Sequence, residues 1–156
     1  MRQPNFKFDW FVPNHIIGLT HFHAEVIEED IMGVMKKGQE LTSAIEKDFH
    51  ILIDNRVVKM PGLLSLEQLK QMVPYVNHPS LRWIVVIKPE NLLLDTDSLP
   101  IEDDGEKHLK NVSSLVEAIE FLTEKAPEVK WQNTNIDFFP NSNIADLIKG
   151  ADNKVR

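Results

Sequence analysis

The apolar segment Leu81–Ile87 limits the possible folds of this chain more than any other part of the sequence. It reads Leu-Arg-Trp-Ile-Val-Val-Ile, which is rich in β-branched side chains and too short for a buried helix. Such a segment predicts a strand that is covered on both faces. Phe49–Asp54 is a second short apolar strand, and it ends in a carboxylate. Strands of this kind lie inside sheets covered by helices, so we predict an α/β fold.

Helical and strand patterns alternate around these two segments. Phe6, Phe8 and Trp10 alternate with polar residues, which predicts a first strand that pairs with a second one as a hairpin. The other expected elements are the strands 15–24 and 108–112 and the helices 26–46, 65–73, 114–126 and 143–149, the last of which should stop at Gly150. Gly38 lies on the apolar face of the long helix and predicts a close approach of that helix to the sheet.

This order predicts one α/β domain over residues 1–127, followed by a C-terminal tail over 128–156. The domain should contain a mixed, mostly parallel sheet of four to five strands, with the N-terminal hairpin and crossover helices. The tail contains Trp131, Phe138 and Phe139, which make it too apolar to be free in water. We therefore expect it to dock on the domain or on a partner.

Composition excludes several classes of function. The chain has 156 residues and a net charge of −7, which disfavours nucleic acid and anionic membranes as partners. It contains no cysteine, which excludes disulfides, zinc–thiolate sites and a cysteine nucleophile. No apolar run approaches the ~18–20 residues of a membrane span, and the first ten residues lack the apolar core of a signal peptide. A cytoplasmic protein is expected.

Polar residues next to the predicted strands and helices are the candidate binding residues. Asp54 and Asn55 close the Phe49–Asp54 strand, and ligands of open α/β sheets bind beyond the carboxyl ends of strands. A turn carboxylate is the alternative interpretation of Asp54. Ser65 and Gln68 have the spacing of a capping box, so Ser65 is interpreted first as a helix N-cap.

Metal and catalytic patterns are weak. His21, His23 and Glu25 would share a strand face with His15, but a helix start near Glu25 would remove that ligand. The segment Asp95–Pro100 begins like a calcium loop and then has Leu and Pro where an oxygen ligand and a glycine are needed. Nucleophile and phosphate-binding motifs are absent. We expect no metal, no cofactor and no enzymatic activity.

Five segments occur in an order that resembles a known family: 10–17, the acidic start of the long helix, 50–54, 78–83 and 112–122. The chain is similar to small bacterial proteins of the STAS-like group (sulfate transporter and anti-sigma factor antagonist), in the branch grouped with SEC14-type lipid-binding folds. The resemblance implies a sheet with helices mainly on one side and binding of a partner kinase. It also implies a phosphorylatable hydroxyl after the strand that ends at Asp54, but no Ser or Thr occurs here before Ser65.

We expect a non-catalytic regulatory or protein-interaction module that binds a protein partner or associates with itself, for example as a homodimer. Its binding residues would be Asp54, Asn55 and Ser65 in the 55–65 loop region, together with the tail aromatics Trp131, Phe138 and Phe139. The alternative from the resemblance is a binder of an apolar small molecule or lipid, held in a cavity between helix and sheet near Gly38. A third hypothesis is an enzyme or metal protein that uses His21, His23 and Asp54.

Overall fold

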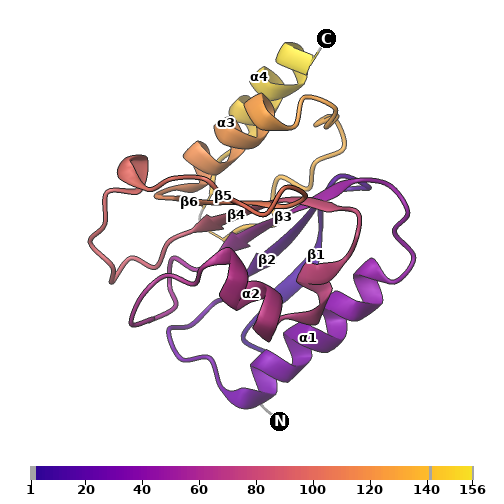
Figure 1. Ribbon diagram of the computed structural model, residues 1–156. Coiled ribbons are helices and arrows are strands. Elements are labelled where there is room, and N and C mark those ends of the chain that lie inside the picture. Colours follow the sequence, from indigo (N-terminus) through magenta and orange to yellow (C-terminus); the bar gives the residue numbers. More distant parts are fainter. Residues whose placement is uncertain (1–2, 141, 156) are drawn as a thin grey trace.

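The computed structural model describes residues 3–140 and 142–155, with side chains given as far as Ala151. Figure 1 shows the arrangement of the helices and strands. The strands are β1 (Lys7–Val12), β2 (Ile16–Thr20), β3 (Phe49–Asp54), β4 (Leu81–Ile87), β5 (Glu102–Asp103) and β6 (His108–Val112). The helices are α1 (Glu28–Thr42), α2 (Leu66–Met72), α3 (Leu115–Lys125) and α4 (Ala145–Val155), and two short 3-10 helices are η1 (Pro74–Asn77) and η2 (Thr96–Ser98).

The six strands form one mixed sheet in the order β1-β2-β3-β4-β6-β5. The pairs β2–β3, β3–β4 and β4–β6 are parallel, while β1 and β5 pair antiparallel at the two edges. The predicted α/β class, the N-terminal hairpin and the interior position of β4 are confirmed. The predicted number of four to five strands is wrong, because the sheet also contains β5. This two-residue strand lies in the acidic connection, and it is too short for a sequence pattern to reveal.

Helices cover both faces of the sheet, so the molecule has three layers (Figure 1). α1, α2 and η1 lie over one face, where Ile51 and Ile53 of β3 point. α3, α4 and the segment between them lie over the other face, where Leu52 points. The resemblance implied helices mainly on one side, and the structure differs because the C-terminal residues supply a second layer.

The helix α1 packs closely against η1 at Gly38. A Cβ atom at Gly38 would lie 2.3 Å from Cδ1 of Tyr75, so only glycine fits this contact. The close approach predicted for Gly38 is therefore present, but the neighbour is an aromatic ring of η1 and not a strand. Pro74 begins η1 directly after the C-cap Val73 of α2, so this proline ends the helix that was predicted over 65–73.

The tail crosses the face opposite α1 and packs on the hairpin. Phe139 makes an edge-to-face contact with Phe11 of β1, with ring centroids 4.9 Å apart. The backbone amide of Asn135 donates a hydrogen bond of 2.8 Å to the carbonyl of Phe11. α4 continues through Gly150 to Val155, so the predicted stop at Gly150 is wrong. Buried Ile148 and Ala151 lie on both sides of Gly150, and their burial outweighs a glycine cost of ~1 kcal/mol.

Candidate functional site

The carboxyl ends of the parallel strands bring together a buried ion pair. Thr20 and Asp54 are the last residues of β2 and β3 and are paired in register, so their side chains are neighbours. Asp54 is only 4% exposed. The Thr20 hydroxyl donates to Oδ2 of Asp54 at 3.1 Å, and Arg56 donates from Nε to Oδ1 at 2.9 Å and from Nη2 to Oδ2 at 2.8 Å. The amide of Arg56 adds a fourth bond to Oδ1 at 3.1 Å.

This arrangement makes Asp54 an anchor for the loop that follows β3. Four donors occupy the two oxygen atoms of its carboxylate, which leaves little of it to act on a ligand. The hydrogen bonds from Arg56 to Asp54 raise the pKa of the guanidinium. Arg56, which is 25% exposed, is therefore the member of the pair that a partner can reach.

Buried Asn5 organises the loop that follows β2. Its side-chain Oδ1 accepts the amides of Phe22 and His23 at 2.9 and 2.8 Å. Its Nδ2 donates to the carbonyls of His23 and Glu25 at 3.0 and 2.8 Å. Sequence reasoning missed Asn5 because its partners lie 17 to 20 residues further along the chain. Asn5 therefore holds residues 22–25 in one conformation.

His21 belongs to the same arrangement, because one of its ring nitrogen atoms is bonded to the backbone of Asn5. Its Nδ1 lies 2.8 Å from the carbonyl oxygen of Asn5, so Nδ1 carries the proton and donates it. Burial lowers the pKa of His21, although the bond to Asn5 opposes this. His15 lies before the first residue of β2 and His21 after its last, so they cannot share a metal. Among the described residues, no three His, Cys, Asp or Glu side chains are placed to hold a metal ion.

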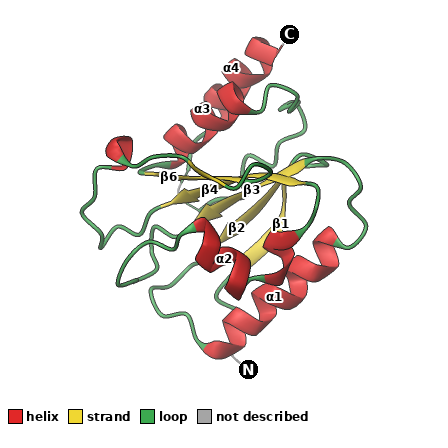
Figure 2. Ribbon diagram, in the orientation of Figure 1, coloured by secondary structure: helices red, strands yellow, loops and turns green. Residues whose placement is uncertain are grey.

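The loops after β2, β3 and β4 are tied to one another by hydrogen bonds. The backbone amide of Lys59 donates a hydrogen bond of 3.3 Å to the carbonyl oxygen of Ala24, which joins the loop after β2 to the loop after β3. The amide of Glu90 donates to the carbonyl of Arg56 at 3.0 Å, and the Asn91 side chain pairs with the backbone of Met60 at 2.9 and 3.3 Å. These bonds join the second loop to the third. Figure 2 shows the three loops in green on the same side of the sheet.

A shallow groove runs between these loops, with a volume of about 660 Å³. We call it the carboxyl-edge groove. It is lined by Phe22, His23, Ala24, Arg56, Val57, Val58, Lys59, Glu90 and Asn91. Phe22 and Val57 are 44% and 43% exposed, which leaves two apolar side chains in water beside charged ones. A cleft of about 190 Å³ that reaches Asp54 adjoins the groove and shares Arg56 and Val57 with it.

The other predicted site residues have structural contacts in this fold. The backbone amide of Asn55 donates a hydrogen bond of 3.1 Å to the carbonyl oxygen of Ile87. Asn55 also lines a cavity of about 30 Å³, which holds no more than a water molecule. Ser65 is the N-cap of α2, because its hydroxyl accepts the Gln68 amide at 3.1 Å while Gln68 Oε1 accepts the Ser65 amide at 2.8 Å. The predicted capping box is confirmed. Asp95 caps η2 through the Asp97 amide at 3.1 Å.

The tail aromatics are not exposed. Trp131, Phe138 and Phe139 are 0%, 2% and 2% exposed and belong to the core with Phe11. Of the two expected placements, the tail takes the one on the domain, where β1 and α4 cover these aromatics, so they offer no accessible surface to a partner. They reach a partner only if the tail leaves the domain.

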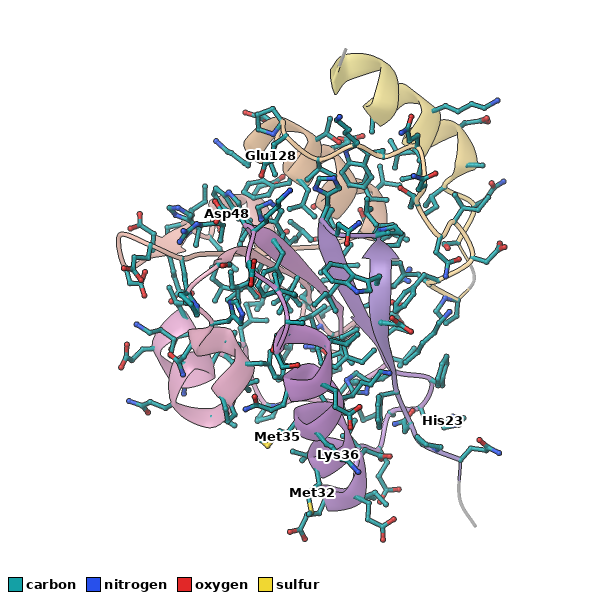
Figure 3. All side chains as sticks on the ribbon, turned by 90° about the vertical axis from the view of Figure 1, so that its right-hand side faces the viewer. His23, Met32, Met35, Lys36, Asp48 and Glu128 are labelled. Atoms are coloured by element: carbon teal, nitrogen blue, oxygen red, sulfur yellow. The ribbon has the colours of Figure 1, made fainter. Side chains whose placement is uncertain are left out.

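A second polar contact, which the sequence did not reveal, lies at the opposite end of the strands. Buried His50 of β3 accepts the Trp83 amide at Nδ1 at 3.2 Å, so Nε2 carries its proton and donates to Glu128 at 2.9 Å. Burial lowers the pKa of His50, and Glu128 opposes this effect. Figure 3 labels Glu128 and Asp48 near one another at this end and His23 far from them. His50 thus connects the sheet to the start of the tail.

Comparison with known proteins does not extend these findings: no protein-family model, curated protein or solved structure matches the chain. Within residues 3–140 and 142–155, no helix is long and apolar enough to cross a membrane.

Proposed function

We propose that this protein is a non-catalytic interaction module that binds a protein partner at the carboxyl-edge groove. The observation that supports this most is the pair Phe22 and Val57, which lie half exposed in one groove beside Arg56, Lys59 and Glu90. An apolar centre with a charged rim is the usual composition of a protein–protein interface. The proposal keeps the 55–65 loop as a binding segment but moves its centre away from Asp54, Asn55 and Ser65.

The rigidity of the loops supports a binding role. Asn5, Asp54 and Asn91 tie the three loops to the sheet and to one another through side-chain hydrogen bonds. A surface that is already ordered loses less conformational entropy when a partner binds. The proposal does not rest on the tail aromatics. The alternative of an apolar ligand near Gly38 has no supporting observation, since the Tyr75 ring occupies that position.

Photo-crosslinking in cells that normally make the protein tests the proposal. A photoreactive amino acid is placed at Val57, and the matched control carries it at Val116 of α3, which is similarly exposed at 48% compared with 43%. We expect a discrete protein adduct from position 57 that is absent from position 116 and is lost in Phe22→Glu. Circular dichroism verifies that this variant is folded. Equal labelling from both positions, or no adduct from position 57, would contradict the proposal.

A further inference from the structure

The loop that follows β4 presents two leucines to water. Leu93 is 95% exposed and Leu94 is 43% exposed, and they follow one another in the chain. Single exposed apolar residues are ordinary on protein surfaces. Adjacent leucines on a long connection need an explanation only if the loop is held in place, because a mobile loop could fold them inwards.

Two lysines and a hydroxyl pair hold this loop on both sides of Leu93. Lys88 donates from Nζ to the carbonyl of Leu92 at 2.8 Å, immediately before Leu93. Beyond Leu93, Lys110 donates to the carbonyls of Thr96 and Leu99, both at 2.8 Å. The Thr96 hydroxyl also lies 2.5 Å from that of Ser113. The loop therefore presents its leucines from a fixed backbone, as a preorganised contact does.

The charge of Lys59 in the carboxyl-edge groove complements the carboxylates beside Leu93. Asp95 and Asp97 are exposed and follow the leucines, whereas exposed Lys59 lines the groove. Arg56 also lines the groove, but Asp54 already binds it, and Glu90 adds one negative charge there. Asn91 lines the groove and stands two residues before Leu93, so the leucines and the groove are close neighbours on one surface. A surface that carries a projection beside a complementary groove can pair with itself about a two-fold axis.

We infer that the partner of the groove is a second copy of this chain, in a symmetric dimer that places Leu93 of each copy in the carboxyl-edge groove of the other. This inference rests on the proposed function, since it names the partner of the same groove. Leu93 contacts the partner subunit's Phe22 and the partner subunit's Val57. Asp97 faces the partner subunit's Lys59. The net charge of −7 opposes association, so these local contacts must overcome a general repulsion.

A lipid surface is a poorer fit for the leucines. Glu90, Asp95 and Asp97 flank them in the sequence, and carboxylates are repelled by anionic headgroups. A different protein as partner is a separate possibility that the experiment distinguishes.

Sedimentation velocity of the purified chain, from about 1 to about 100 µM, tests the inference. We expect a monomer–dimer equilibrium in this range. Leu93→Lys should weaken it at least about tenfold, because two buried leucines are lost from each dimer. Met32→Lys is the matched control: Met32 is 62% exposed on α1 and does not line the groove, so its substitution should leave the dimer intact.

A charge exchange tests the orientation of the two copies. Lys59→Glu and Asp97→Lys should each weaken the dimer, and the double variant should restore part of the loss. A monomer at every concentration, or equal dissociation by Leu93→Lys and Met32→Lys, overturns the inference. A monomeric protein that still crosslinks from Val57 to a different protein in cells also overturns it, but leaves the proposed function standing.

Discussion

Replacing Gly38 with alanine tests how tightly α1 packs on η1. The new Cβ atom would lie 2.3 Å from Cδ1 and 2.6 Å from Cε1 of Tyr75, whereas carbon atoms in contact are about 3.5 Å apart. The helix or the ring must therefore move by roughly 1.2 Å. Tyr75 cannot easily do so, because it is buried and its ring lies 5.3 Å from that of Phe8.

The expected free-energy change follows from two opposing effects. Alanine is the better helix former by about 1 kcal/mol, while overpacking a tight core costs ~1–3 kcal/mol. We therefore expect Gly38→Ala to lower the free energy of unfolding by about 0–2 kcal/mol. The control is Gly150→Ala in α4, where nothing lies within 4 Å of the new Cβ. It should raise the free energy of unfolding by up to ~1 kcal/mol.

Urea unfolding followed by circular dichroism measures both variants against the native chain. A second comparison in a Tyr75→Leu background isolates the contact, since Gly38→Ala should raise the free energy of unfolding by up to ~1 kcal/mol once the ring is gone. If Gly38→Ala were stabilising in the native background, as Gly150→Ala should be, the ring would not limit the approach of α1 and the reasoning would be refuted.

Three further predictions concern the polar contacts. Asp54→Ala should lower the free energy of unfolding by ~2–4 kcal/mol in urea titrations, because it leaves the buried pair with Arg56 incomplete. Asp48→Ala removes an exposed ion pair and should change the free energy of unfolding by less than ~1 kcal/mol. Similar losses in the two variants would contradict the burial argument. Burial lowers the pKa of His50 below 6.5, so the folded state binds a proton less tightly at His50 than the unfolded chain does. The contribution of His50 to the free energy of unfolding is therefore present above pH 6.5 and is lost as the pH falls below it. Glu128→Gln should lower the His50 pKa further in an NMR titration, and a pKa at or above 6.5 in the native chain would disprove the assignment. Asn5→Ala should cost ~1–3 kcal/mol and speed amide exchange in residues 22–25, and unchanged exchange there would show that the loop is held otherwise.

Local patterns in the sequence were sufficient for much of the secondary structure. The bounds of β3 and β4 follow from short apolar runs, and the starts of α2 and α3 follow from Ser65 and Ser114, whose hydroxyls accept amides three residues later. These signals are strong because each involves residues that are neighbours along the chain. Gly150 predicted a helix end that does not occur, since burial on both sides of it overrides a weak intrinsic preference.

The site was only partly predictable. Its position at the carboxyl ends of the strands follows from the fold class, and Asp54 was identified for that reason. The part that Asp54 plays depends on Arg56 folding back onto it and on Thr20, which is 34 residues away. The half-exposed pair at the centre of the groove, Phe22 and Val57, carries no sequence motif.

The sequence by itself determined the α/β class, the hairpin, the interior strands and the helix caps, because periodicity and capping act over a few residues. Only the tertiary structure decided that the tail joins α3 in a second helical layer, that Trp131 is buried, and that the backbone on both sides of exposed Leu93 is held by Lys88 and Lys110. Exposure and long-range hydrogen bonding depend on which distant segments meet. An aromatic or leucine residue has the same sequence signature whether a neighbouring layer covers it or leaves it free.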